Sequence, residues 1–153
     1  MAVTESLVQF VARHRAAGHR IVFTNGCFDV LHRGHVTYLE QAKQRGDVLI
    51  VALNDDASVT RLKGSDRPVN TVADRAAVLA GLSCVDYVVQ FTEDTPARLI
   101  ELIKPDVYAK GGDYTTLPES GMVRSFGGEV AILDHVAGQS TTATITRIRK
   151  GKG

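Results

Sequence analysis

Two histidines three positions apart, His32 and His35, are the groups of this sequence best suited to act on a phosphate. They lie in residues 26–35 (GCFDVLHRGH), directly after an apolar run. Their spacing places both imidazoles on one face of a helix that begins near Gly34. The start of a helix presents unpaired backbone N–H groups and a partial positive charge, which together favour an anion. Imidazoles at this place can donate hydrogen bonds to phosphoryl oxygens as negative charge moves toward a leaving group, so the pattern predicts phosphoryl chemistry.

Three other interpretations of the histidine pair stay open at the level of sequence. The imidazoles could bind zinc together with Asp29 or Cys27, although zinc needs three or four ligands and no further cluster of His, Cys or Glu completes the set. They could instead cap or pack a helix. A nucleophilic role for a histidine or for Cys27 lacks an orienting partner at short range.

Length and composition set the frame for this chemistry. The 153 residues carry 18 Lys and Arg against 17 Asp and Glu, a net charge of +1, and 44% of them are hydrophobic. This length predicts a single domain over residues 1–153, with its core in about 20–149 and a tail at 150–153. The balanced charge argues against binding of nucleic acid by bulk electrostatics, but a few cations suffice for a small phosphorylated ligand.

Targeting signals and cysteines add little. No apolar run reaches the roughly 18–20 residues of a membrane span. Residues 1–10 do not resemble a signal peptide, and the two distant cysteines, Cys27 and Cys84, do not indicate a disulfide scaffold. We therefore expect a cytoplasmic protein with no nucleic-acid and no membrane partner.

Short apolar runs alternate with helical patterns along the chain. The runs lie at residues 21–23, 48–53, 87–89, 107–109 and 130–133, and most do not alternate with polar residues, which is typical of strands covered on both faces. Helices are expected from Thr4 to Gly18, from near Gly34 to Gly46, from Thr71, from Thr95-Pro96, over 118–126, and from Ser140. This order predicts an α/β fold: a Rossmann-like, doubly wound, five-stranded parallel sheet with helices on both faces. Ligands bind such sheets beyond the carboxyl ends of the strands, where the strand order reverses, which selects the loops at 24–35 and 110–117.

The histidine segment also resembles the signature of the HxGH nucleotidyltransferase superfamily, G-x-F-D-x-x-H-x-G-H. Each fixed position is present, at Gly26, Phe28, Asp29, His32, Gly34 and His35. Further motifs of the superfamily follow in order, at residues 61–64 (RLKG), 67–70 (RPVN), 110–114 (KGGDY) and 140–142 (STT). The resemblance covers nearly the whole chain. It is greatest to the branch of stand-alone adenylyltransferases that form ADP-heptose from D-glycero-D-manno-heptose 1-phosphate.

The resemblance implies a reaction and a set of site residues. A sugar-phosphate oxygen would attack the α-phosphorus of ATP and expel pyrophosphate, with Mg²⁺ accompanying the ATP. Catalytic roles are implied for His32, His35 and Lys63, and Arg75 and Asn25 would lie on the sugar-phosphate side. The implied nucleotide- and phosphate-binding positions are Gly26, Cys27, Phe28, Asp29, Gly34, Lys110, Gly111, Asp113, Ser140, Thr141 and Thr142.

The resemblance also implies a biological setting. The product would serve synthesis of the lipopolysaccharide core or another surface glycan. A separate heptose kinase and a phosphatase would act earlier in the pathway. Members of the family commonly form homodimers.

Plainer structural interpretations of several positions stay open. Lys63 could be a solvated loop lysine, and Arg75 an exposed helix arginine. The hydroxyls of 140–142 could be ordinary helix caps, and Asp113 could form an Asx-turn.

Other functions also stay open. Within the same class, the alternative is a cytidylyltransferase acting on glycerol 3-phosphate or phosphoethanolamine. Cys27 stands where many cytidylyltransferases carry Thr or Ser, and His135 where glycerol-phosphate cytidylyltransferases place an arginine, which favours ATP by resemblance. From other classes, the alternatives are a zinc-dependent hydrolase that uses His32, His35 and Asp29, and a non-catalytic nucleotide-binding module.

Overall fold

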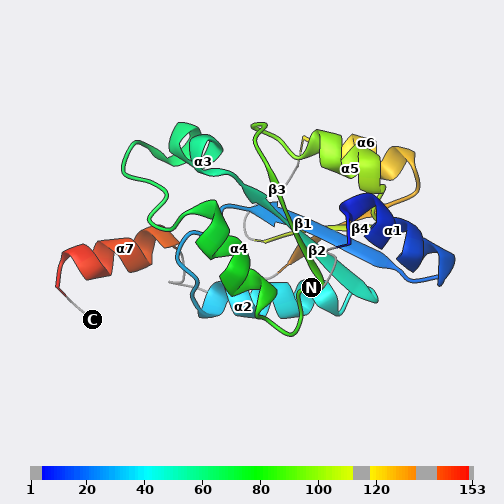
Figure 1. Cartoon of the computed structure of the whole chain (residues 1–153), viewed down its shortest axis with the longest axis horizontal. Helices are drawn as coiled ribbons and strands as arrows, with labels where there is room; N and C mark the ends of the chain where they lie inside the picture. Colours follow the sequence, from blue (N-terminus) through cyan, green and yellow to red (C-terminus); the bar gives the residue numbers. More distant parts are fainter. Residues whose placement is uncertain (1–4, 112–117, 134–140, 152–153) are drawn as a thin grey trace.

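Five strands of apolar, largely β-branched residues form one parallel sheet in the computed structural model, which describes residues 5–111, 118–133 and 141–151. In chain order the elements are α1 (Leu7–Ala16), β1 (Ile21–Gly26), α2 (Arg33–Lys43), β2 (Val48–Asn54), α3 (Asp56–Lys63), α4 (Val72–Ala80), β3 (Tyr87–Phe91), α5 (Ala97–Ile103), β4 (Val107–Gly111), α6 (Ser120–Ser125), β5 (Glu129–Leu133) and α7 (Thr141–Arg149). Neighbouring strands run parallel, in the order β3-β2-β1-β4-β5. The α/β class and the five-stranded parallel sheet are confirmed (Figure 1).

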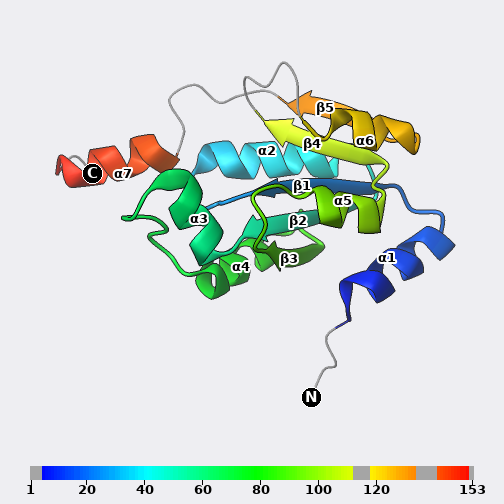
Figure 2. The ribbon, with the colours of Figure 1, turned by 90° about the horizontal axis from the view of Figure 1, so that it is seen from above.

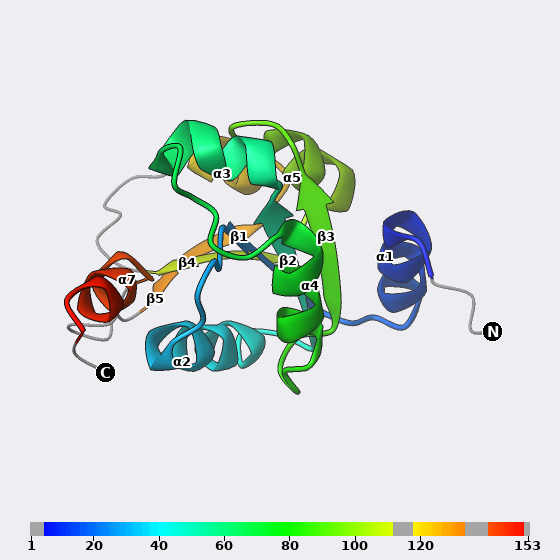
Figure 3. The same cartoon turned by 60° about the vertical axis from the view of Figure 1, so that its left-hand side comes forward.

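Helices cover both faces of the sheet, and each face has its own apolar core. Because successive side chains of a strand point to opposite faces, Ile21 and Phe23 pack with residues of α1, α5 and α6, whereas Val22 packs with residues of α2 and α4. Figure 3 shows α2 and α4 on the side of the sheet opposite to α5. This two-sided cover explains why the strand patterns are apolar throughout rather than alternating. None of the helices in the described ranges is long and apolar enough to cross a membrane.

An aspartate placed just before a strand ties that strand to its neighbour at the amino end of the sheet. Asp106 Oδ2, before β4, accepts from the Ile21 N–H of β1 at 2.7 Å and from Arg15 Nη1 at 2.6 Å. Asp86, before β3, accepts from the Leu49 N–H of β2 at 2.8 Å. Charge at this end of the sheet is therefore used for the fold, which leaves the opposite, carboxyl end for a ligand.

One helix of the structure, α3, was not expected from the sequence. Its eight residues carry few apolar side chains and bury only Ser58 and Val59, so the helical period is too weak to see. Asp55 caps this helix, because its carboxylate accepts from the Ser58 N–H at 2.9 Å. No helix was expected between residues 53 and 71, and that expectation is therefore wrong.

Two predicted helix caps are also wrong. α1 begins after Ser6 rather than Thr4, because Ser6 and Gln9 form a reciprocal capping box. α5 begins after Pro96 rather than Thr95, and no side chain caps it. The expected cap at Thr71 is confirmed, since its hydroxyl accepts from the Asp74 N–H.

Gly128, between α6 and β5, has no room for a side chain. A Cβ atom there would lie 2.7 Å from Val123 Cγ1 and 2.8 Å from the Pro105 carbonyl oxygen. We expect Gly128→Ala to lower the free energy of unfolding, measured with urea, by about 1–3 kcal/mol, which is the usual cost of overpacking. Gly121→Ala is the matched control, because nothing lies within 4 Å of a Cβ atom there and alanine favours a helix. Equal stability of the two variants would contradict the close approach at Gly128.

Candidate active site

The candidate active site lies where the strand order of the sheet reverses, between β1 and β4. The start of α2 meets the carboxyl end of β1 on this side of the molecule (Figure 2). In parallel sheets this is the place where ligands bind. The loop at 24–35 lies at this edge, as predicted, whereas residues 112–117 of the second expected loop lie outside the described residues.

The rings of His32 and His35 stack on each other. Their centroids are 3.9 Å apart and their planes are inclined by 21°. His32 is the N-cap of α2, and its Nδ1 accepts from the His35 N–H at 3.4 Å. Because an accepting Nδ1 carries no proton, the neutral ring of His32 has its proton on Nε2. The cap therefore fixes a tautomer that presents an N–H donor on the far side of the ring.

His35 is neutral at physiological pH. Burial, together with the nearby His32, lowers the pKa of His35 from 6.5 to about 4. Its Nδ1 is buried and has no hydrogen-bond partner within the part of the chain that the structure describes. The Phe28 ring packs against the His35 ring, with centroids 5.1 Å apart. A neutral, partly dehydrated imidazole can donate one hydrogen bond to a phosphate. Negative charge on that phosphate strengthens the hydrogen bond, because little water is present to screen it.

The loop between β1 and α2 holds an unusual backbone conformation at Phe28. Its φ angle is +47°, a left-handed value that costs a bulky residue free energy. Gly26 makes this possible, because a Cβ atom there would lie 2.9 Å from Phe28 Cε2. The Phe28 N–H donates to no acceptor among residues 5–111, 118–133 and 141–151. The strained conformation of Phe28 thus leaves its backbone N–H available as a donor in the loop that carries the histidines.

Asp29 holds the loop against the segment before α4. Its side chain is fully buried and accepts from Arg67 Nε at 2.8 Å and from the backbone N–H groups of Val69 and Asn70. Burial raises the pKa of a carboxyl group, but the hydrogen bonds from Asn70 and Val69 and the charge of Arg67 outweigh it and lower the pKa of Asp29. Both carboxylate oxygens are engaged, so Asp29 braces the loop and is not placed as a third zinc ligand beside the histidines.

Arg75 is buried rather than exposed, with 2% of its surface accessible. Its Nη1 donates to the carbonyl oxygens of Cys27 at 2.7 Å and Asn54 at 2.8 Å. Its Nε donates to the Asn70 carbonyl at 3.0 Å, and its Nη2 pairs with Asp56 Oδ1 at 2.8 Å. The interpretation of Arg75 as an exposed helix arginine is wrong. The guanidinium joins the ends of β1 and β2 to the starts of α3 and α4.

The surroundings of Cys27 disfavour its thiolate form. Burial raises the pKa of the Cys27 thiol, and the charges of Lys63 and Arg75 oppose that rise without reversing it. The sulfur lies 3.9 Å from Asn54 Oδ1. Since the thiolate is the reactive form, this environment does not support catalysis by Cys27.

Lys110, near the end of β4, faces the end of β1. Its Nζ donates to the Asn25 carbonyl at 2.9 Å, and Asn25 Oδ1 accepts from the Tyr108 hydroxyl at 2.7 Å. Burial lowers the pKa of Lys110 to about 8, with Glu119 acting in the opposite direction. The predicted residues Asn25 and Lys110 are thus brought together, at the same edge as the histidine loop.

Lys63 is the last residue of α3 and not a loop residue, which corrects the expectation from sequence. Its side chain is close enough for its charge to lower the pKa of both Cys27 and Lys110. An exposed lysine at a helix end can move toward a bound anion. Four cations therefore act on Cys27 in the loop after β1, namely Lys63, Arg75, Arg67 and Lys110.

The start of α7 touches that same loop. Thr141 Oγ1 donates to the Val30 carbonyl oxygen at 3.1 Å. Thr142 is exposed, and its carbonyl oxygen accepts from Thr146 within the helix. The other end of α7 is held by an ion pair of 2.7 Å between Arg149 and Asp66.

The remaining predicted positions divide into two groups. Gly34 lies in the first turn of α2, and Gly111 ends β4 against the ring of Tyr38. Asp113 and Ser140 lie outside the described residues.

Sequence reasoning assigned no role to three residues that support the site: Asn54, Asp56 and Arg67. Arg67 belongs to the RPVN motif, and Asp56 is the partner of Arg75. The sequence did contain a signal for Asp56 and Arg67, because a charged residue next to a buried strand needs a partner of opposite charge. Which charged residue meets which depends on tertiary structure, so the pairs could not be assigned from spacing.

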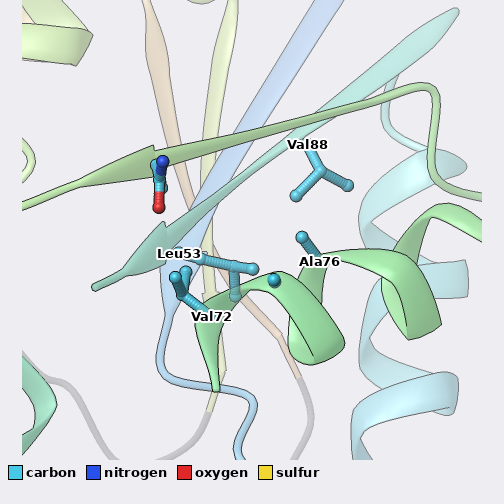
Figure 4. A pocket seen from close by; sticks show the side chains of 6 residues that line it. Leu53, Val72, Ala76 and Val88 are labelled. Carbon is cyan, nitrogen blue, oxygen red and sulfur yellow. The ribbon is translucent and has the colours of Figure 1, made fainter. Parts of the chain in front are cut away.

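A separate cavity lies between α4 and the strands β2 and β3 (Figure 4). It has a volume of about 260 Å³ and is lined by Leu53, Val72, Ala73, Ala76, Val88 and Gln90. This lining carries no charge and does not suit a phosphate. Within the described ranges, no group of three or more His, Cys, Asp or Glu side chains is arranged to hold a metal ion.

Comparison with known proteins agrees with this geometry. The chain belongs to the cytidylyltransferase-like family, whose model matches residues 23–139. It is 58% identical to the bifunctional protein HldE of Pseudomonas aeruginosa PAO1 over 148 residues, which are 95% of this chain and 31% of that protein. HldE of Alkalilimnicola ehrlichii is 60% identical over 145 residues, 94% of this chain and 30% of that protein. The chain thus spans about a third of the length of the curated relatives it matches.

Solved structures share the fold. A lipopolysaccharide core biosynthesis protein from Thermoplasma volcanium superposes with a TM-score of 0.65 and 29% identity, covering 78% of this chain and 98% of that one. Pantothenate synthetase from Thermus thermophilus superposes with a TM-score of 0.58 and 17% identity, covering 93% of this chain and 68% of that one. The second likeness concerns the fold alone.

The lowered pKa of His35 predicts a pH dependence of stability. A folded-state pKa of about 4 against an ordinary 6.5 means that the unfolded chain binds this proton more readily, so the stabilisation is complete above pH 6.5 and is lost as the pH falls toward 4. Urea unfolding at pH 7 and pH 5.5 should show that the wild type loses about 1 kcal/mol more than His35→Gln over this interval. Identical losses in the two proteins would contradict a neutral, buried His35.

Proposed function

We propose that the protein transfers AMP from ATP to D-glycero-D-manno-heptose 1-phosphate, giving ADP-heptose and pyrophosphate. The observation that carries this proposal is the stacked, tautomer-fixed pair His32 and His35 beside the available Phe28 N–H, at the sheet reversal of a cytidylyltransferase-like chain. The choice of a heptose acceptor rests on the motif resemblance and on the likeness to a lipopolysaccharide core biosynthesis protein. The product would then serve lipopolysaccharide core or surface-glycan synthesis.

The reaction proposed needs no general base. A phosphomonoester has its second pKa at about 6, so the heptose phosphate is largely dianionic at neutral pH. One of its oxygens forms a bond to the α-phosphorus of ATP, while the bond from that phosphorus to the oxygen bridging to the β-phosphate breaks. The bonding electron pair leaves with pyrophosphate, and no proton has to move. The protein's task is then to position the two anions and stabilise the charge that moves between them.

The described residues are suited to that task. Nε2–H of His32 and a ring N–H of His35 would donate to the α-phosphate region, and the Phe28 N–H would hold the triphosphate. Lys63 and Lys110 would offset phosphate charge, and an arriving polyanion would favour the protonated form of Lys110. Thr141 and Thr142, at the start of α7, would contact the β- and γ-phosphates together with Ser140.

Mg²⁺ is proposed to enter with ATP. Asp29, the carboxylate nearest the histidines in sequence, already has both oxygens engaged. Mg²⁺ usually keeps several waters and binds substrate phosphates, which suits a site with few available carboxylates. Bound in this way, the ion would offset triphosphate charge without dedicated protein ligands.

The cellular setting follows from the substrate. From the family resemblance we also propose that a heptose kinase and a phosphatase act earlier in the pathway. We propose that the reaction takes place in the cytoplasm, because it consumes ATP. Assembly as a homodimer is proposed from the family resemblance.

The direct test is a search for the nucleotide sugar. Purified protein is incubated with Mg²⁺, ATP or CTP, and a panel of acceptors: heptose 1-phosphate, other sugar 1-phosphates, glycerol 3-phosphate and phosphoethanolamine. We expect mass spectrometry to find ADP-heptose with release of pyrophosphate. Turnover of CTP with glycerol 3-phosphate or phosphoethanolamine, and none of ATP, would replace this proposal with the cytidylyltransferase. No turnover of any pair would favour a binding module.

His35 should matter for turnover and little for the fold. We expect His35→Ala to lower kcat by more than about 100-fold, the size of effect seen when a donor to transition-state charge is removed. The melting temperature at pH 7.5 should fall only by the packing lost against His32 and Phe28, because His35 is neutral there and its Nδ1 has no partner among the described residues. Arg98→Ala, which removes an exposed arginine paired with Glu93, serves as a control for both measurements. A large loss of stability with normal turnover would instead make His35 a packing residue.

A further inference from the structure

Arg75 contacts the peptide bond that contains the Phe28 N–H. The carbonyl oxygen of Cys27 and the N–H of Phe28 belong to one peptide bond, and Arg75 Nη1 donates to that oxygen at 2.7 Å. In a planar trans peptide the C=O and N–H bonds point in opposite directions. The Phe28 N–H therefore points away from Arg75.

The contacts of Arg75 fix the orientation of this peptide. The same Nη1 atom also donates to the Asn54 carbonyl at 2.8 Å, so Arg75 links this peptide to the end of β2. Asp56 and the Asn70 carbonyl hold the other guanidinium nitrogens. With all of these bonds in place, the guanidinium plane cannot rotate without breaking several of them at once.

Charge adds to geometry. A cation bound to a carbonyl oxygen draws electron density from the peptide and makes its N–H a stronger donor, as in cooperative hydrogen-bond chains. The positive φ of Phe28 would relax if the peptide were free to turn, because left-handed values are unfavourable for a phenylalanine. Polarisation requires a cation behind the peptide, and holding the peptide in place requires a hydrogen-bond donor there. Arg75 supplies both.

We infer that Arg75 is a positioning residue that aims and polarises the Phe28 N–H toward the nucleotide phosphates. This inference rests on the proposed function and replaces direct contact of Arg75 with the sugar phosphate. Arg75 is buried, and four of its five N–H groups donate to Cys27, Asn54, Asn70 and Asp56. Lysine cannot substitute for it, because one ammonium group cannot reach four acceptors that surround a planar fork.

The test follows the Phe28 amide directly. The chain contains five phenylalanines, so protein labelled with ¹⁵N-phenylalanine gives few signals, and Phe28→Tyr assigns the one of interest. Wild type and Arg75→Lys are titrated with Mg²⁺ and α,β-methylene-ATP, an analogue that cannot transfer AMP. We expect the Phe28 amide proton to move downfield in the wild type and to move less than half as far in Arg75→Lys. The kcat of AMP transfer should fall about 10–100-fold, with a smaller change in the KM for ATP.

Two controls separate positioning from loss of fold. The other phenylalanine signals report whether Arg75→Lys is folded, and Arg98→Lys, an exposed helix arginine, should leave the Phe28 shift and kcat unchanged. If the lysine variant does not fold, Arg75→Ala is measured with and without millimolar guanidinium. Return of the Phe28 shift and of kcat with guanidinium supports the inference.

A Phe28 amide that does not respond to the analogue, or responds equally in wild type and folded Arg75→Lys, overturns the inference, as does a failure of guanidinium to restore the shift. The proposed function fails separately. If the wild type forms no ADP-heptose while the Phe28 shift still depends on Arg75, then the positioning role stands for nucleotide binding and the acceptor is wrong.

Discussion

A parallel sheet ends in a row of backbone carbonyl groups, and at the ends of β1 and β2 these groups are buried and must find donors. Arg75 satisfies the carbonyls of Cys27, Asn54 and Asn70 with one guanidinium, whose own charge is met by Asp56. This one planar group holds three segments in place: the loop that carries the histidines, the start of α3 and the start of α4. Removing one partner of such a buried arrangement would leave a charge or several carbonyls unpaired, which is costly.

The charged groups and N–H donors of the site favour an anionic ligand. His35 and Lys110 both titrate lower than usual, because each is buried and has another nitrogen base close by, His32 for one and Lys63 for the other. The one buried carboxylate of the loop, Asp29, is neutralised by Arg67. Asp56 is likewise paired with Arg75, so the charges of Lys63 and Lys110, the latter opposed by Glu119, act beside the N–H donors of the histidine loop. An anionic ligand would be attracted by these lysines and donors.

Local patterns in the sequence predicted what depends on local physics. The apolar runs predicted the strands. Their alternation with helices predicted that the strands run parallel, because right-handed crossover connections leave few other arrangements. The spacing of His32 and His35 predicted two rings on one face, and the rings do stack. α3 escaped notice because its helix is short, polar and capped by Asp55, so it has almost no apolar period.

The roles of the charged residues were harder to predict, for a different physical reason. Arg75 lies on a helix whose pattern allows an exposed side chain, and only tertiary packing brings Cys27 and Asn54 to it. Asp29 carries a family motif, yet its partners Arg67 and Asn70 lie about forty residues away. Long-range pairs of this kind are set by topology, which sequence spacing does not report.

The attachment of α7 has a thermodynamic consequence. Thr141 and Val30 are joined across 111 positions of the chain, α7 has no buried residue, and its far end is held by an exposed ion pair. Such contacts are individually weak, so the docked helix is stabilised only slightly over an undocked one. A ligand that binds the loop after β1 and the start of α7 together must strengthen their attachment by as much as that attachment strengthens its binding. The affinity of the site is therefore open to tuning by substitutions along α7 that never touch the ligand.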